Sequence, residues 1–325
     1  MTGQTLLEDL PVEVWFTIFS YLNAREQFHS FFNLKSNINQ LLSNYYHRIN
    51  LKFKDKDSEC VLEHVLRCSP QSNCISSLRL DNINKMNIFH DINCLHFPNL
   101  RSLTLCNLHV TNDILNLLRY YALSLEYLNV SSFVSSKWVE LLDLIISFSK
   151  LQTCYLNLNM ILCPFRTELR SPLKHLIFPG ANRVCQKTNL VSFLEYFPSL
   201  ESLHVGCRKI INNDATYEPV SVSNLSLQLS YLPESFNEFM SFMLAIASHV
   251  KKLQIKCCHS VSNILYVKVF HWMRLLDSLD SLNELILIIT PGKNVTKKNW
   301  KRRCDELMEL TKMRNIHLQV ISVKN

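Results

Sequence analysis

The chain has 325 residues, of which 47% are hydrophobic and 19% are charged, and its formal net charge is +7. This composition predicts a packed globular protein and excludes a disordered chain, which would carry few apolar residues and a high net charge. With 4 glycines, the sequence disfavours sites built on glycine-rich phosphate-binding loops. The mild positive charge is compatible with acidic partners but does not by itself indicate nucleic acid.

The first predicted element is a helix within residues 7–22, which read LEDLPVEVWFTIFSYL. Pro11 suits a first helical turn because the amide donor that it lacks has no partner there, and Glu13 suits the positive end of the helix dipole. Apolar residues then recur at steps of three and four, which indicates one helical face. Two further short helices are predicted at residues 25–32 and from about residue 36. Such short helices bury little surface by themselves, so we expect part of their apolar set to dock elsewhere.

From residue 75 onward, a unit of the form apolar-x-x-apolar-x-apolar recurs, as in residues 100–105 (LRSLTL). Its middle apolar residue falls at 78, 103, 128, 154, 176 and 203. A degenerate copy lies at residues 225–229, and more widely spaced copies follow, centred at 253, 285 and 316. The first spacings are those of leucine-rich repeats. One such unit cannot bury its apolar face alone. Stacked units therefore predict a solenoid with parallel strands on the inner face and helices outside.

Side chains alternate between the two faces of a strand, so the residues that flank the buried leucines are expected to line the inner face. Tyrosines there suit contact with a protein because they offer a large area at a small entropy cost. The candidate substrate-contacting residues are Tyr127, Tyr155, His175, His204, Lys252 and Lys256. The alternative for each is a solvated strand face without a ligand.

The first helix resembles that of an F-box, through Leu10-Pro11, Glu13 and the run from Ile18 to Leu22. The repeats resemble those that follow many F-boxes. The resemblance implies an α/β protein with a short N-terminal three-helix F-box domain at residues 4–46. A linker with a short helix would follow at 47–74, and an irregular leucine-rich-repeat solenoid at 75–325. F-boxes of that family bind the Skp-type adaptor of a cullin–RING ubiquitin ligase. Carried over by position, the adaptor-binding residues are Leu7, Leu10, Pro11, Val14, Ile18 and Leu22. An ordinary helical cap on a larger domain is the alternative.

Motifs for catalysis are missing from the sequence, which contains no G-x-S-x-G, no H-E-x-x-H and no Walker-type loop. The 12 cysteines include no repeated CxxC pair, so no metal or other cofactor is predicted, and no motif marks a reactive thiol. We therefore expect a non-catalytic subunit that recognises an unidentified target protein for an SCF-type ubiquitin ligase. The alternative is a leucine-rich-repeat interaction scaffold outside any ubiquitin ligase.

The N-terminus has no basic and then apolar leader, and the longest apolar stretch, at residues 239–250, is too short to span a bilayer. We expect no membrane partner and a cytoplasmic or nuclear location. The basic run at residues 293–303 resembles a nucleic-acid-binding patch. Its continuation into Leu307 and Leu310 instead favours the solvated face of an amphipathic helix, which disfavours nucleic acid as a partner.

Overall fold

The computed structural model describes residues 10–22, 26, 30–31, 38, 76–81, 97–132, 137–157, 170–179, 184–207, 209–211, 221–229, 236–247, 249–257, 269–289 and 296–322. The chain divides into two compact units, residues 1–135 and 136–325, which are described separately below. Ten strands follow one another in a parallel sheet in the order β1-β2-β3-β4-β5-β7-β9-β10-β11-β12. The predicted α/β class and the parallel stacking of the repeat strands are therefore confirmed.

The first unit contains two described helices and three described strands, and neighbouring strands are parallel. Its elements are α1 (Val12–Tyr21), β1 (Ser77–Asp81), β2 (Ser102–Leu108), α6 (Asn112–Tyr120) and β3 (Tyr127–Ser132). Of the second and third predicted helices, the structure describes residues 26, 30, 31 and 38, each in a helical conformation. The rest of these helices and the predicted linker at 47–74 lie outside the described residues, so the three-helix domain and the domain boundaries stay predictions.

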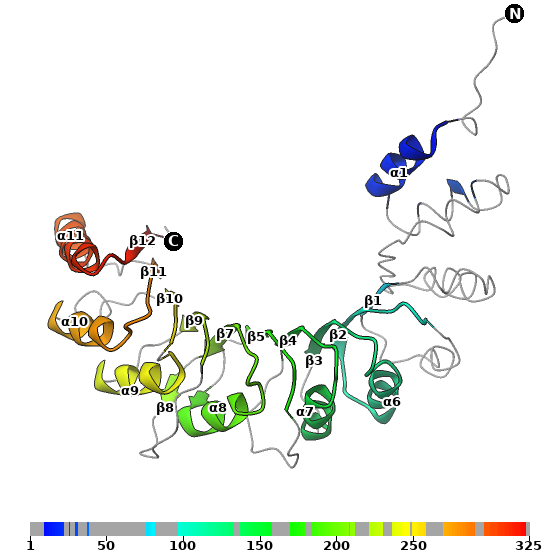
Figure 1. Ribbon diagram of the computed structural model, residues 1–325, viewed down its shortest axis with the longest axis horizontal. Coiled ribbons are helices and arrows are strands. Elements are labelled where there is room, and N and C mark those ends of the chain that lie inside the picture. Colours follow the sequence, from blue (N-terminus) through cyan, green and yellow to red (C-terminus); the bar gives the residue numbers. More distant parts are fainter. Residues whose placement is uncertain are drawn as a thin grey trace, which may run out of the picture. The chain divides into compact units, whose positions relative to one another are not determined.

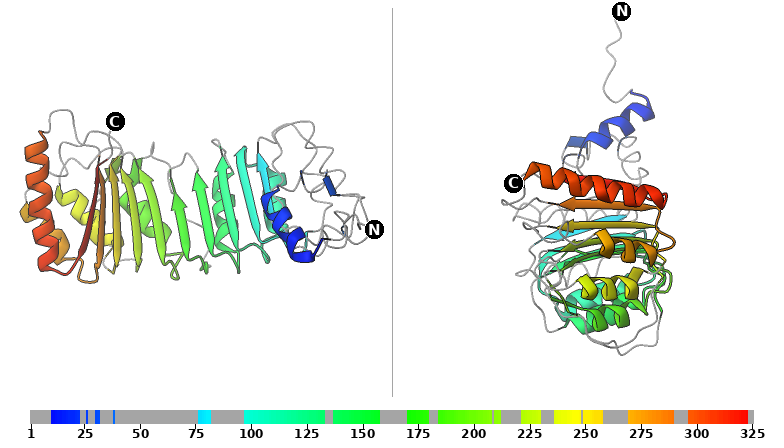
Figure 2. Two further views of the ribbon diagram at one scale, coloured as in Figure 1. Left: turned by 90° about the horizontal axis from the view of Figure 1, so that it is seen from above. Right: turned by 90° about the vertical axis from the view of Figure 1, so that its left-hand side faces the viewer.

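The second unit alternates strands and helices. Its strands are β4 (Thr153–Asn157), β5 (His175–Phe178), β6 (Val184–Gln186), β7 (Ser202–Cys207), β8 (Lys209–Ile211), β9 (Asn224–Leu229), β10 (Lys252–Cys257), β11 (Glu284–Ile289) and β12 (His317–Ser322). Its helices are α7 (Trp138–Ile146), α8 (Lys187–Leu194), α9 (Phe236–Ala247), α10 (Val269–Asp277) and α11 (Lys297–Met313). The left view of Figure 2 shows the strands side by side, and Figure 1 shows the helices gathered on one face of them. We call the opposite face of the sheet the open face.

The core of the second unit is a row of leucines that neighbouring strands place at the same register. Leu203 pairs with Leu225, which pairs with Leu253, which in turn pairs with Leu285. All four side chains are buried, and the residues on either side of them are more exposed, except for Ile286 beside Leu285, which is buried as well. The period-2 reading of the repeat is therefore confirmed in β7, β9 and β10, whereas in β11 the predicted inner-face residue Ile286 is buried.

The predicted position of the last repeat along the chain is wrong. The sequence pattern places Ile316 at the centre of the unit, whereas the register pairs Leu318 with Leu285. Ile316 instead follows the end of α11, where Asn315 adopts a left-handed φ of 56°. The amide of Ile316 donates to the carbonyl of Thr311, and the amide of Asn315 donates to that of Lys312, as in a Schellman cap. Asn315 and Ile316 therefore belong to the helix cap, although the sequence pattern assigned them to the repeat unit.

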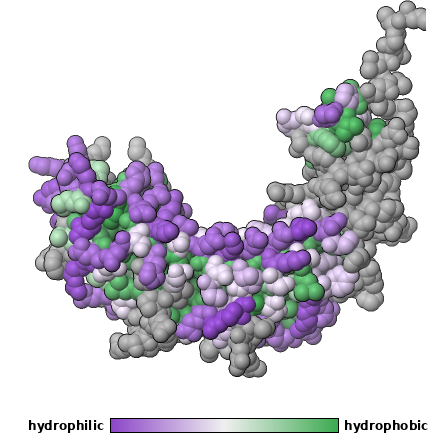
Figure 3. All heavy atoms as spheres, viewed as in Figure 1, coloured by the Kyte–Doolittle hydropathy of each residue, from purple (hydrophilic) through white to green (hydrophobic). Residues whose placement is uncertain are grey.

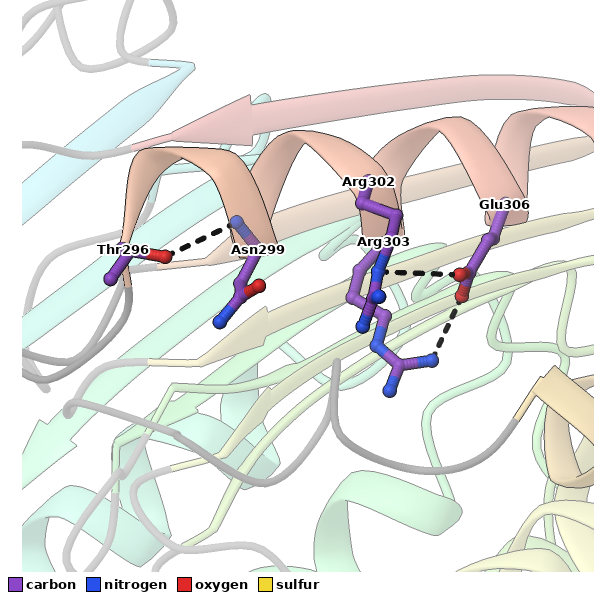
Figure 4. A network of polar contacts seen from close by, with 5 residues as sticks. All are labelled: Thr296, Asn299, Arg302, Arg303 and Glu306. Atoms are coloured by element: carbon purple, nitrogen blue, oxygen red, sulfur yellow. Dashed lines mark hydrogen bonds and ion pairs between the residues drawn. The ribbon is translucent and has the colours of Figure 1, made fainter.

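The long helix α11 is amphipathic, as predicted from the sequence. Leu307, Leu310 and Thr311 are buried, whereas Lys298 and Lys301 are exposed. The helix begins at an N-cap, Thr296, whose hydroxyl accepts from the amide of Asn299 at 3.3 Å (Figure 4). The predicted packing of this helix on the repeats is consistent with that burial.

Candidate functional site

One face of α1 is buried in a small aromatic cluster within the first unit. Trp15 and Phe19 are each 1% exposed and pack with Ile38. The ring of Phe31 meets both aromatic rings edge-on, with centroid distances of 5.3 Å to Trp15 and 5.6 Å to Phe19. Such edge-to-face contacts add to the apolar burial that holds α1 in place.

A second face of α1 is apolar and exposed. Val12, Val14 and Tyr21 are 41%, 39% and 84% exposed, and Ile18 between them is half-buried. Val14, Ile18 and Tyr21 follow one another at steps of four and three, so they lie along one stripe of the helix. Figure 3 shows hydrophobic surface on α1. We call Val14, Ile18 and Tyr21 the α1 stripe.

The six predicted adaptor-binding residues fall into different environments. Leu7 lies outside the described residues, and Pro11 and Val14 are exposed. Leu10, Ile18 and Leu22 are half-buried, and Leu10 and Ile18 also pack against the aromatic cluster. The prediction omitted Val12 and Tyr21. Counting helical steps onward from Val14 and Ile18 would have identified Tyr21, because helix neighbours recur every three to four residues.

Five of the six predicted substrate-contacting residues lie on the strands of the second unit, and Tyr127 lies on β3 of the first. The side chains of Tyr127, Tyr155, His175, His204 and Lys252 are half-buried, and that of Lys256 is exposed. All six alternate with buried neighbours along their strands, so the predicted face is confirmed. No contact with a substrate follows from this placement alone.

The two candidate lysines of β10, Lys252 and Lys256, differ in their ion-pair partners. The ammonium of Lys252 lies 2.9 Å from a carboxylate oxygen of Glu284 on β11, the strand next to it. Lys256 has no ion pair with any residue that the structure describes. Lys252 is therefore already neutralised within the sheet, whereas no acid among the described residues compensates the charge of Lys256.

The environment of His204 lowers the pKa of its imidazole. Burial lowers the pKa of the His204 imidazole, and the ammonium of Lys256 lowers it further. The Nδ1 atom of His204 lies 2.8 Å from the hydroxyl oxygen of Ser226 on β9. This contact orients the ring. His204 and Lys256 are both predicted candidates, but nothing in the sequence indicates that one affects the other.

The basic run before and within α11 is partly paired within its own helix. The carboxylate of Glu306 contacts Arg303 at 2.8 Å and Arg302 at 3.6 Å (Figure 4). Such exposed pairs on one helix contribute little to stability but reduce the charge available to a polyanion. The pairing agrees with the interpretation of this run as a solvated helix face.

Two of the described cysteines, Cys154 and Cys304, are poorly suited to nucleophilic chemistry. Burial raises the pKa of the Cys154 thiol, and burial together with Asp305 raises that of Cys304, so both thiols are protonated at neutral pH. Among the described residues, no group of three or more His, Cys, Asp and Glu side chains is placed to hold a metal ion. None of the described helices combines the length and the apolar character needed to cross a membrane.

A scan against protein-family models finds no match for this chain, and a search of curated proteins finds no similar sequence. The residues and their geometry are therefore the basis for assigning a function.

Proposed function

We propose that the protein is the non-catalytic substrate-recognition subunit of an SCF-type ubiquitin ligase. In this proposal α1 binds a Skp-type adaptor and the open face of the sheet binds a target protein. The proposal rests on one observation, which is that α1 carries apolar residues on two of its faces. One face holds Trp15 and Phe19 in the aromatic cluster, and the other presents Val14 and Tyr21 to solvent.

A helix that packs only on its own chain needs one apolar face, with polar residues on the other. Single exposed apolar side chains are common on protein surfaces, but a stripe of them on one helix is typical of an interaction site. The α1 stripe includes a tyrosine, which is among the residues that most often dominate binding energy at interfaces. The resemblance of residues 7–42 to an F-box suggests the chemistry of the partner, an apolar groove on a Skp-type adaptor.

The mechanism would be proximity and not bond chemistry. A receptor that holds adaptor and target together raises the effective concentration of the target's lysines near a charged ubiquitin-conjugating enzyme. The protonated state of Cys154 and Cys304 supports this reading, because neither thiol is activated to carry ubiquitin as a thioester.

The test is direct binding of the purified full chain to a purified Skp-type adaptor, measured by calorimetry. We expect the unmodified chain to bind, and a chain with Val14→Lys and Tyr21→Lys to lose binding. A chain with Met308→Lys and Met313→Lys is the matched control, because these two side chains are also exposed and apolar but lie on α11. If the unmodified chain does not bind the adaptor, the second candidate, a repeat scaffold outside any ubiquitin ligase, takes its place.

A further inference from the structure

The described sheet ends at β12, which lacks the features that keep an edge strand from pairing. β12 has β11 as its single neighbour among the described strands. Natural edge strands avoid further pairing through charged residues, prolines and bulges. β1, at the other end of the strand order, reads SLRLD and carries two charges, whereas β12 reads HLQVIS, with no proline and no Lys, Arg, Asp or Glu. The sequence of β12 therefore permits a further strand at its outer edge.

The backbone groups at this edge are those of Leu318 and Val320. The amide of His317 points toward β11, because it donates at 2.8 Å to the carbonyl just before that strand. Backbone groups alternate along a strand, so those of Leu318 and Val320 point to the outer edge. Both side chains are half-buried, although their register partners Leu285 and Leu287 are fully buried. The leucine core is therefore less covered at β12 than inside the sheet.

Helix α11 lies beside β12 at this end of the sheet, as the left view of Figure 2 shows. A groove of about 420 Å³ between the two elements has Met308 of α11 and Leu318 of β12 in its lining. Met308 is 47% exposed. Lys301, Asp305 and Met308 follow one another at steps of four and three, so they form one stripe on the groove side of the helix. We call β12 together with this flank of α11 the end surface.

The charges of α11 are divided along its length. Residues 297–303 (KKNWKRR) carry five cations and no acid, and residues 304–310 (CDELMEL) carry three acids and no cation. The cations lie toward the positive end of the helix dipole, which disfavours them, so helix stability does not explain this arrangement. Four exposed side chains of the two halves make no ion pair with any residue that the structure describes: Lys298, Lys301, Asp305 and Glu309.

The boundary between the two halves lies level with the middle of β12. The helix and the strand are level where the amide of Ile316 donates to the carbonyl of Thr311, at 2.9 Å. Gln319 lies three strand residues, or about 10 Å, beyond Ile316. The helix covers this distance in about six to seven residues, which leads back to Cys304 and Asp305. A two-fold axis through the centre of the β12 edge would therefore also pass through the charge boundary of α11.

We propose that the end surface binds a second copy of this chain, with the two β12 strands antiparallel about Gln319. This interface is isologous, because the same surface is used by both copies. It places Leu318 opposite Val320 of the second copy. The outward backbone groups of these residues then pair, and their half-buried side chains cover one another.

The same axis matches the charges of the two helices. Because it reverses the direction of α11, the basic half of each helix lies beside the acidic half of the other. Lys301 then lies within about one helical turn of Asp305 of the second copy, and Lys298 is equally close to Glu309. A peptide with charges of one sign would match only one half of α11, so charge complementarity favours a second copy.

The experiment measures self-association of the purified full chain by analytical ultracentrifugation at micromolar concentrations, and we expect a reversible dimer. An acidic variant carries Lys298→Glu with Lys301→Glu, and a basic variant carries Asp305→Lys with Glu309→Lys. Each variant alone should dimerise about tenfold or more weakly than the unmodified chain, because like charges then face each other. An equimolar mixture of the two should recover dimerisation, because the acidic helix of one variant matches the basic helix of the other.

Two further measurements test the strand contact. Val320→Pro removes an outward donor but no hydrogen bond to β11, and it should weaken dimerisation. Amide exchange at Leu318 and Val320 should slow as the protein concentration rises. The matched control is Arg119→Glu with Lys150→Glu, which reverses two exposed cations outside α11 and β12 and should dimerise like the unmodified chain.

A chain that stays monomeric would overturn the proposal, whether the amides of Leu318 and Val320 exchange freely or are protected by another part of the chain. A dimer that both charge variants leave unchanged, or a mixture of folded variants that fails to associate, would also overturn it. Thermal unfolding identifies any variant that is not folded. The inference does not rest on the proposed function, since the measurement contains no adaptor and no target.

Discussion

The first and last helices that the structure describes, α1 and α11, distribute their apolar residues differently. α11 buries Leu307 and Leu310 and covers its outward face largely with charged residues, among which Glu306 pairs with Arg302 and Arg303. α1 contains a single charged residue, Glu13, and exposes apolar side chains beside its buried ones. The contrast indicates that α11 packs on its own unit through one apolar face and exposes only Met308 and Met313 among its large apolar residues, whereas α1 retains a stripe of exposed apolar residues that suits a second protein.

The largest expected effect concerns the buried face of α1. Trp15→Ala should destabilise the aromatic cluster by about 3–5 kcal/mol, because it removes a fully buried aromatic ring and leaves a cavity. Amide hydrogen exchange across α1 measures the loss. Tyr21→Ala is the control, since Tyr21 is 84% exposed, and it should leave protection nearly unchanged. Equal loss of protection in both variants would contradict the division of α1 into two faces.

The second-largest effect is expected from substitutions on the exposed face of α1. Val14→Lys with Tyr21→Lys should weaken adaptor binding by about 100-fold, or roughly 2.7 kcal/mol, because charged side chains would be buried against an apolar surface. Calorimetric titration with the adaptor measures the change. The same titration with Met308→Lys and Met313→Lys should match the unmodified chain. A loss in the α11 variant as large as that in the α1 variant would show that exposed apolar residues of the two helices are equivalent.

A smaller effect on stability is expected at the N-cap of α11, which differs from that of α1. Thr296 caps α11 through its side chain, whereas Pro11 at the N-cap of α1 makes no side-chain hydrogen bond. Thr296→Ala should therefore cost about 1 kcal/mol of unfolding free energy, measured by chemical denaturation. Thr296→Ser keeps the hydroxyl and should restore most of it. Stability unaffected by the alanine would mean that the cap contributes nothing to α11.

The smallest effect is expected from the charged face of α11. Glu306→Gln removes two ion pairs with partly exposed arginines and should cost about 0.5 kcal/mol or less at low salt. The difference should shrink further in high salt, because screening weakens exposed pairs. Denaturation curves at the two salt concentrations provide the measurement. A salt-independent cost above that value would assign Glu306 a structural role beyond the ion pairs.

Much of the fold could be predicted because its signals are local. The repeat spacing predicted parallel strands, and the period-2 pattern correctly separated buried Leu253 from half-buried Gln254. The frame of the last repeat could not be predicted, since the Schellman cap at Asn315 and Ile316 replaces strand residues by helix-end geometry. A pattern of apolar positions does not distinguish a helix cap from the start of a strand when both place an isoleucine inward.

For the candidate sites, the residue types were recognisable but their grouping was not. The helical spacing of Val14 and Ile18 identified α1 as an interface candidate, yet Tyr21 was missed and the packing of Ile18 on the cluster was not foreseen. His204 was a candidate, but its contact with Ser226 on the neighbouring strand could not be predicted from the sequence.

For most of the repeat strands and for α1 and α11, the amino-acid sequence by itself determined which segments become strands or helices and which residues face the core, because both follow from periodicity within a few residues. The tertiary structure alone decided which open-face residues are neighbours, since the register between parallel strands depends on the helices and connections that lie between them. It also decided which apolar face of α1 is covered. Trp15 and Phe19 are buried because Phe31 and Ile38 return to cover them, while no described residue buries Val14 or Tyr21.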